Sequence, residues 1–230
     1  MITATYLSRG FSSFWLQLTP WLNNYVNYLN KGGLQRIDTP LFSNDSPSFR
    51  AINNTVAFYK FIELHLTPDC SEDLSNAMNK AFLFLKKLPR NNLDDYKLTN
   101  ENIEIITQQA RRIFYKYRNV NIIANPIFPG CGLILNAEGD FYYQDTLVEI
   151  KAGERNLYPS DIKQLIVYGA LNYINKNGYP IKKFELFNPR QGIFYSESIE
   201  NIGLSVSDKS IEEIFTEVCV FADNYGLLSN

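Results

Sequence analysis

The segment Gly139-Asp140-Phe141-Tyr142-Tyr143-Gln144-Asp145-Thr146-Leu147-Val148-Glu149-Ile150-Lys151 decides the fold that we predict for this chain. Its two β-prone runs are joined by Gln144-Asp145, which predicts a hairpin with a two-residue turn. Counting outward from that turn places Asp140 opposite Glu149. Because strand side chains alternate between faces, Lys151 shares the face of Glu149. Two carboxylates and one ammonium group are therefore expected on one patch of sheet.

The composition of the 230 residues is that of a globular protein, with 45% hydrophobic and 14% aromatic side chains. A formal net charge of -2 argues against a protein that coats nucleic acid without specificity. The charge is uneven, because residues 197–230 hold seven acidic side chains and one basic side chain, which leaves +4 on the remaining residues. A local nucleic-acid site on that basic body remains compatible with the sequence.

Cysteine usage and hydropathy exclude several classes of protein. Cys70, Cys131 and Cys219 are widely spaced and form no Cys-x-x-Cys pair, so we expect neither a disulfide framework nor a zinc or iron–sulfur site. The sequence has no basic leader followed by an apolar segment and no run of about 18 apolar residues. We therefore expect a cytoplasmic protein with no membrane partner.

Residues 1–100 are expected to form a helical N-terminal region. Helical spacing of apolar residues predicts three helices, which begin near Pro20, Ser48 and Ser71 and end at Gly32, before Pro68 and at Pro89. Their aromatic stripes are interpreted as core. His65, the only histidine, is interpreted as a packed or surface residue.

Residues 101–196 change from helix to an alternation of strands and helices, and residues 197–230 are expected to form an acidic C-terminal helix packed on that core. The elements expected after residue 98 are a helix capped by Thr99, strands at 133–135, 141–143 and 146–150, a helix capped by Ser160 over 161–176, strands at 184–187 and 193–195, and a last helix over 208–224. The helix between strands 146–150 and 184–187 makes these two strands parallel.

Asp140 and Glu149 would repel each other across the hairpin unless a positive group lay between them. Mg²⁺, with Mn²⁺ as a substitute, fits such oxygen ligands, and the carbonyl of Ile150 can complete the set. Lys151 could then orient or deprotonate a water molecule or neutralise a transition state. The alternative is a surface strand with ordinary polar alternation and a Glu–Lys pair.

Two features favour a site over a surface strand. Gln164 and Tyr168 are four residues apart and share one helix face, which the crossover lays against the sheet. Glu149 and Lys151 follow the apolar pair Leu147-Val148, which places them at the C-terminal end of a central strand, where open α/β sheets bind ligands.

This combination resembles the PD-(D/E)xK nuclease superfamily, and within it the RecB-like exonuclease branch. The resemblance covers roughly residues 101–196 and implies an α/β (mixed α+β) fold, with a restriction-endonuclease-like core whose mixed central sheet is flanked by helices. It implies Asp140 and Glu149 as metal ligands and Lys151 as the catalytic lysine. Gln164 and Tyr168 would match the helix motif of that branch and contact the DNA or the site.

The chain departs from the family pattern at several positions. No proline precedes Asp140, no upstream histidine can be placed as a ligand, and the four cysteines that hold an iron–sulfur cluster in some relatives are absent. Glu104 is a weak match to an acidic residue that some members carry on the preceding helix.

Basic side chains around the hairpin have two interpretations. The resemblance implies phosphate contacts from Arg155 and Lys163, whereas solvated surface cations are the alternative for Lys163 and for Arg190. Arg111 and Arg112 lie near the end of the helix that follows Thr99, where they either stabilise the helix C-terminus or face phosphate.

The resemblance implies a Mg²⁺-dependent nuclease that hydrolyses phosphodiester bonds, with DNA as the expected substrate. The chain has no Walker A motif, so a motor or sensor subunit is the expected protein partner, and bacterial anti-phage defence, restriction or repair the expected setting. Two alternatives are a catalytically inactive nuclease-fold module that binds nucleic acid or a partner protein, and a helical interaction protein.

Overall fold

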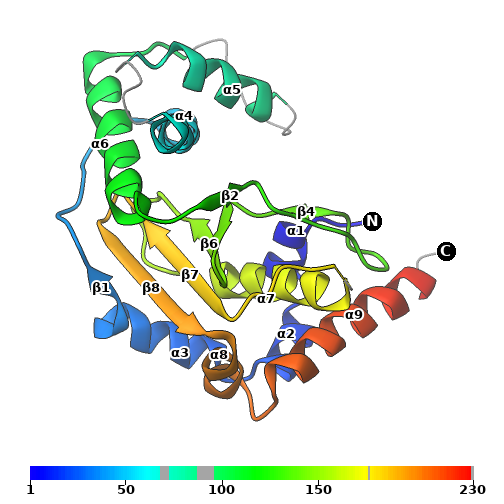
Figure 1. The fold of residues 1–230 in the computed structure, drawn as a ribbon. Coiled ribbons are helices and arrows are strands. Elements are labelled where there is room, and N and C mark those ends of the chain that lie inside the picture. The colour runs from blue at the N-terminus through cyan, green and yellow to red at the C-terminus, as the bar shows by residue number, and fades with distance from the viewer. Residues whose placement is uncertain (68–72, 87–95, 176, 229–230) are drawn as a thin grey trace.

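The computed structural model describes residues 1–67, 73–86, 96–175 and 177–228 and shows a mixed α/β fold (Figure 1). A six-stranded mixed sheet has the order β1-β8-β7-β6-β5-β2, and β3 and β4 form a separate pair. The strands are β1 (Gln35–Arg36), β2 (Ile122–Ala124), β3 (Ile127–Phe128), β4 (Ala137–Glu138), β5 (Phe141–Tyr143), β6 (Thr146–Ile150), β7 (Lys183–Asn188) and β8 (Ile193–Ser198). The predicted fold class, a mixed sheet flanked by helices, is confirmed.

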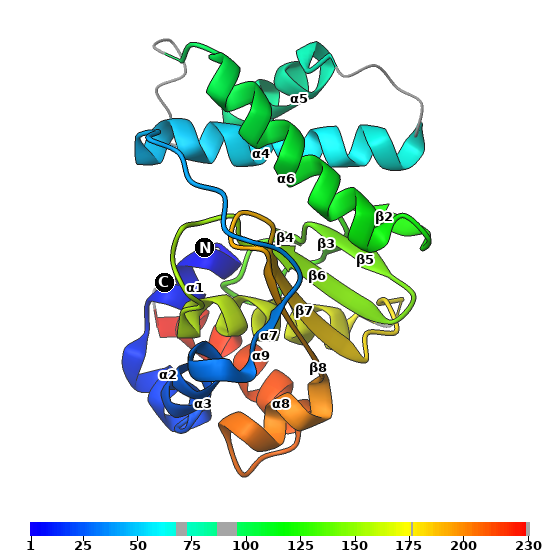
Figure 2. The ribbon, with the colours of Figure 1, turned by 90° about the vertical axis from the view of Figure 1, so that its left-hand side faces the viewer.

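Helices cover both faces of the sheet, and the layers separate clearly in Figure 2. The upper layer holds α4 (Pro47–Leu66), α5 (Ser75–Leu85) and α6 (Asn100–Tyr117). The lower layer holds α1 (Ala4–Arg9), α2 (Ser12–Leu18), α3 (Leu22–Tyr28), a π-helical turn at Leu29–Gly33, α7 (Pro159–Ile174), α8 (Ile199–Val206) and α9 (Ile211–Leu228). The sheet therefore lies between two layers of helices, each with its own apolar core.

The hairpin forms as predicted. Tyr143 pairs with Thr146 and Phe141 with Val148, and Gln144 in the turn has the left-handed φ of 50° that a two-residue hairpin turn requires. Strand β6 also pairs in parallel with β7 across helix α7, which confirms the predicted β–α–β unit. The hairpin and the crossover together make β6 a central strand.

Helix α6 begins where the sequence predicts. The Thr99 hydroxyl accepts a hydrogen bond from the Asn102 amide at 3.2 Å, and the Asn102 side chain accepts one from the Thr99 amide at 3.1 Å. This reciprocal cap satisfies donors that an uncapped helix start leaves unpaired. At the other end, buried Tyr117 donates to Glu185 of β7, which also forms an ion pair with Lys116 at 3.0 Å.

The strand predicted at residues 133–135 is wrong. Gly132 has a φ of +52° and lies against the backbone of Ala222 in α9, so the chain turns there, and Ile134 makes only isolated bridges to Cys131 and Ile2. The third strand of the hairpin sheet is instead β2, whose Ile123 pairs with Tyr142. Strand β2 was not predicted because it is only three residues long and is flanked by asparagines, which are typical of turns.

Several helix boundaries also differ from the prediction. Ser46 rather than Ser48 caps α4, because Pro47 is well suited to the first helical position. Helix α7 begins at Pro159, not after Ser160, and ends at Ile174. Ser198 caps an additional helix, α8, directly after β8. Helix α4 ends at Leu66, before Pro68 as predicted. The predicted helix start at Ser71 and the expected stop at Pro89 lie outside the described residues, as does Cys70.

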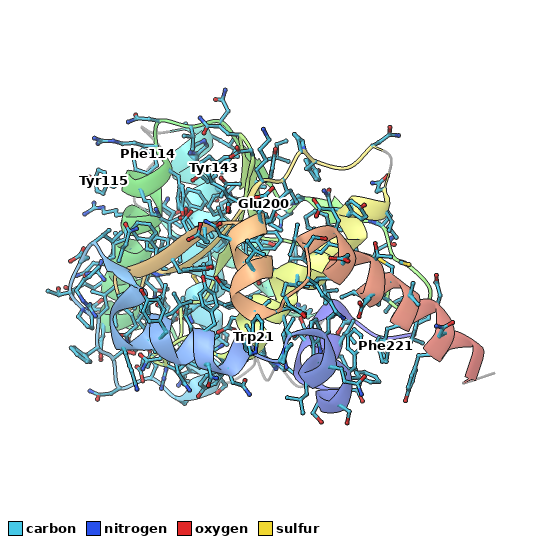
Figure 3. All side chains as sticks on the ribbon, turned by 90° about the horizontal axis from the view of Figure 1, so that it is seen from below. Trp21, Phe114, Tyr115, Tyr143, Glu200 and Phe221 are labelled. Atoms are coloured by element: carbon cyan, nitrogen blue, oxygen red, sulfur yellow. The ribbon has the colours of Figure 1, made fainter. Side chains whose placement is uncertain are left out.

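The first hundred residues contribute to both layers and to the sheet. Helix α1 packs on α7, β1 pairs with β8, and α4 packs along α6. Figure 3 shows the lower layer from below, with Phe221 of α9 close to the N-terminal helices, where its ring stacks on Phe14 with centroids 4.0 Å apart. Helices α1 and α2 were not predicted. Over the described residues, no helix is long and apolar enough to cross a membrane.

We predict that Gly169→Ala destabilises the fold. A Cβ at this position on α7 would lie 2.5 Å from Phe215 and 2.7 Å from Phe184, inside a close-packed core. Overpacking of this kind costs about 1–3 kcal/mol, so thermal unfolding should begin several degrees lower. Gly153→Ala is the control, because its Cβ would meet nothing closer than 3.5 Å. Equal melting temperatures for the two variants would contradict the packing described here.

Candidate active site

A cleft of about 400 Å³ opens between the upper helical layer and the end of the hairpin. One wall comes from α4 and α5, and the other from the residues that lead into β5 and out of β6. The lining residues are Ala51, Asn54, Thr55, Phe58, Tyr59, Phe84, Asn125, Glu138, Gly139, Asp140, Ile150, Lys151, Ala152, Gly153 and Arg155. The predicted hairpin site therefore lies at a concave surface, which is where ligands usually bind.

The two predicted carboxylates occupy the positions that the hairpin register assigns them. Asp140 directly precedes β5, and its Oδ2 accepts a hydrogen bond from the Ile150 amide at 2.6 Å. Glu149 is 6% exposed, and its Oε1 accepts from the Lys151 ammonium at 2.8 Å. Its other oxygen, Oε2, is buried and has no hydrogen-bond partner within the described part of the chain. A buried acceptor without a partner is costly, so a cation or a donor that bound this atom would be stabilising.

The electrostatics of the three charged groups reflect their crowding. Burial raises the pKa of Asp140 well above its usual value, and the Glu149 carboxylate raises it further, against the opposing charge of Lys151. Burial lowers the pKa of Lys151, but the hydrogen-bonded Glu149 and the nearby Asp140 outweigh that effect, and the pKa is raised. Lys151 is therefore a cation at neutral pH, and a second positive charge nearby would favour the ionised form of Asp140.

Gln164 and Tyr168 join the site from beneath the sheet rather than from the cleft. Gln164 Oε1 accepts from Lys151 at 2.8 Å, while its Nε2 donates to Glu149 Oε1 at 3.1 Å and to the Tyr168 hydroxyl at 2.5 Å. Both side chains are buried, and neither lines the cleft. Gln164 thus contacts both Lys151 and Glu149, and Tyr168 contacts Gln164, an arrangement that holds the two charged side chains in place.

The donor set fits a hard divalent cation in part. The unpartnered Glu149 Oε2, the Asp140 carboxylate and the Ile150 carbonyl are oxygen ligands of the type that Mg²⁺ prefers, and Mg²⁺ commonly keeps several waters as its remaining ligands. Across the described residues, no three His, Cys, Asp or Glu side chains gather into a site able to hold a metal on their own. An ion here would therefore depend on water or on oxygens of a substrate.

Three residues near Asp140 had no functional assignment from the sequence: Asn125, Glu138 and Tyr59. Asn125, with a φ of 54°, donates from its amide to the Asp140 carbonyl at 2.9 Å and from its side chain to Glu138 at 2.6 Å. Tyr59 of α4 lines the cleft together with Glu138 and Asp140; burial raises its pKa, and the charges of these two carboxylates raise it further.

Two aromatic residues of the upper layer line the cleft and also pack against the apolar core, as the sequence predicts for Tyr59. Tyr59 and Phe84 line the cleft with their ring centroids 6.4 Å apart, and both rings are only half-buried. Their helical spacing was visible in the sequence, but their position over Asp140 depends on how α4 and α5 pack above the sheet.

Of the basic residues proposed as phosphate contacts, Arg155 alone lines the cleft. It forms a two-pronged ion pair with Asp161 at 2.7 Å for each prong, and its guanidinium lies 4.0 Å from the centroid of the Tyr158 ring. Lys163 instead lies 5.3 Å from the centroid of the Trp15 ring in the lower layer, and it does not line the cleft.

The remaining charged candidates also lie outside the cleft. Arg112 pairs with Asp38 at 2.9 Å and donates to the Pro189 carbonyl at 3.0 Å, while Arg111 is exposed on α6. Glu104 is exposed and accepts from Gln108 at 2.9 Å. The interpretation of Arg190 as a solvated cation is wrong, because its side chain is completely buried.

His65 is partly buried beside Phe61, with ring centroids 5.9 Å apart, and burial lowers its pKa. It does not line the cleft. Cys131 and Cys219 are free thiols.

The chain was compared with family models, curated proteins and solved structures. Neither a family model, nor a curated protein, nor a solved structure matches the chain.

We predict that Asp140→Asn stabilises the protein in the absence of added metal. A carboxyl whose pKa is raised on folding favours the folded state below its unfolded pKa, and this contribution is lost as the pH rises through the folded-state pKa. The amide avoids that loss and can still accept from Ile150. We expect a gain of about 1 kcal/mol at neutral pH, or about 2–4 °C in melting temperature.

Glu104→Gln is the matched control for this measurement, because it removes one carboxylate from an exposed position on α6. Its melting temperature should equal that of the wild-type protein. A lower melting temperature for Asp140→Asn, measured in EDTA, would show that the two carboxylates do not repel each other in the folded state.

Proposed function

We propose that this protein is a Mg²⁺-dependent nuclease that hydrolyses phosphodiester bonds, with DNA as its substrate. The observation that carries the proposal is the unpartnered, buried Oε2 of Glu149, which does not itself line the cleft but neighbours Asp140 and Lys151, which do. An enzyme that needs a cation only when its substrate is present would keep such an atom available. The resemblance of these residues to the PD-(D/E)xK pattern supports the same chemistry.

The residues of the chain divide the work as follows. Asp140, Glu149 and the Ile150 carbonyl would hold Mg²⁺, which supplies Lewis-acid stabilisation of charge on a phosphate and lowers the pKa of bound water. Lys151 points its ammonium at Glu149 from the cleft side and is held by Gln164, so it is placed to stabilise negative charge on the phosphate. Tyr168 fixes Gln164 and thereby the lysine.

The size and lining of the cleft favour a single strand of nucleic acid. A volume of about 400 Å³ lies at the lower end of the roughly 300–1,000 Å³ of small-molecule sites. The cleft would therefore hold a short piece of one strand and would not enclose a duplex. Tyr59 and Phe84 offer rings on which an unstacked base can lie, as aromatic side chains do in proteins that bind single strands.

The proposal includes a partner. The chain carries no Walker A motif, so a motor or sensor subunit would supply translocation or choice of target. A place in bacterial anti-phage defence, restriction or repair is part of the proposal by analogy with small nucleases of this kind.

We predict that Lys151→Ala lowers cleavage at least about 100-fold with little effect on DNA binding, because it removes charge stabilisation at the reacting phosphate. The assay incubates labelled single-stranded, duplex and circular DNA, and RNA, with protein in Mg²⁺, Mn²⁺ or EDTA. Lys163→Ala is the control, since it removes a lysine that packs on Trp15 instead of lining the cleft. Asp140→Ala should lose activity as Lys151→Ala does.

Equal cleavage by wild type, Lys151→Ala and Asp140→Ala would show that these residues are not the site. Binding without cleavage in every metal would instead favour the inactive nuclease-fold module.

A further inference from the structure

A second cluster of charges borders the cleft and has no part in the chemistry described above. It contains Arg50 from the first turns of α4, Arg190 from the turn between β7 and β8, and Glu154 from the loop that follows Lys151. Glu154 Oε2 lies 2.6 Å from Arg50 Nη1, and its Oε1 lies 3.7 Å from Arg190 Nη1. One carboxylate thus faces two guanidinium groups from distant parts of the chain.

The guanidinium of Arg190 is completely buried and incompletely satisfied. It donates to Ser43 Oγ at 3.0 Å and to Asn54 Oδ1 at 3.4 Å, and its separation from Glu154 is too long for a hydrogen bond. The Nε atoms of Arg190 and of Arg50 are both buried without a partner among the described residues. Burial also lowers the pKa of Arg190, with Glu154 opposing the effect. A buried cation of this kind needs more acceptor oxygens than it has here.

The cluster is continuous with the cleft. Asn54, which accepts from Arg190, lines the cleft and donates to the Ala152 carbonyl at 2.8 Å. Gly153 and Arg155, the neighbours of Glu154 in the chain, line it as well. The Glu154 side chain is 37% exposed, so its carboxylate already has access to solvent. The arginines themselves do not line the cleft, but they lie next to residues that do, and moving Glu154 away would free them to bind another acceptor.

We propose that Arg50 and Arg190 form a subsite for a backbone phosphate of the bound strand, and that Glu154 occupies this subsite while the protein is free of substrate. A phosphodiester carries one negative charge, as the Glu154 carboxylate does, so the exchange leaves the charge of the cluster unchanged. Phosphate oxygens also accept from an arginine fork in a two-pronged geometry, which would use the Nε donors that now lack partners. The inference rests on the proposed function in taking nucleic acid as the ligand.

Glu154 therefore competes with the substrate, and removing its charge should strengthen binding. We expect Glu154→Gln to bind a fluorescein-labelled single-stranded 12-mer about three- to ten-fold more tightly than wild type, measured by fluorescence anisotropy in EDTA so that no cleavage occurs. Arg50→Ala should weaken binding and reduce the slope of log K against log salt by about 0.7, the share of one phosphate contact on a single strand.

Loss of a negative charge near the cleft could by itself attract DNA, and a double-variant cycle separates that effect from the subsite. In the Arg50→Ala background, Glu154→Gln should give no gain if the phosphate binds at the arginines. An undiminished gain in that background would overturn the proposal. Because Arg190 is buried, Arg50→Lys serves as the second variant, since it keeps the charge and the fold while it loses the fork.

Glu217→Gln is the matched control. It breaks the partly exposed ion pair between Glu217 of α9 and Lys209, which precedes that helix, at a separation of 2.7 Å, and it makes the same change in charge. Its affinity should equal that of wild type, and equal affinities for Glu154→Gln and Glu217→Gln would overturn the subsite.

The binding and cleavage experiments together distinguish failure of the subsite from failure of the proposed nuclease activity. Tighter binding by Glu154→Gln in a protein that cuts nothing would keep the subsite and refute the nuclease. Cleavage by wild type with unchanged affinity of Glu154→Gln would keep the nuclease and refute the subsite. Absence of any binding to DNA or RNA would refute both.

Discussion

The pairing of β5 with β6 is the constraint on which the rest of the structure depends. Its register sets Asp140 opposite Glu149, and the same strand β6 pairs in parallel with β7, so the hairpin is fixed on both sides. A shift of one residue would turn Glu149 toward the apolar core of the upper layer and would remove Leu147, which is fully buried, from the lower core in which it packs. The packing of the hydrophobic core thus brings the two carboxylates together although they repel each other.

The parts of this arrangement that could be predicted from the sequence are local. The turn at Gln144-Asp145, the Thr99 cap and the four-residue spacing of Gln164 and Tyr168 each depend on residues that are near neighbours in the chain. The fold class followed from these elements, since a strand, a helix and a strand in this order allow few arrangements.

The parts that could not be predicted depend on contacts between distant residues. Arg190 reaches Ser43 across 147 positions and Asn54 across 136, and no pattern near Arg190 distinguishes it from a solvated cation. Tyr59 has the same helical spacing as its buried neighbours, and only the packing of α4 over the sheet places it at the cleft. The turn at Gly132 depends likewise on α9, about ninety residues later in the chain.

The two oxygens of Glu149 have different surroundings, and this difference affects the thermodynamics of ligand binding. Oε1 is held by Lys151 and Gln164, so the carboxylate is immobilised during folding although Oε2 has no partner. The rotamer entropy of that side chain, up to about 2 kcal/mol for a glutamate, is therefore lost before any ion arrives. A cation that binds to Oε2 meets a ligand whose orientation is already set, and the free energy of that contact is not reduced by the ordering of Glu149.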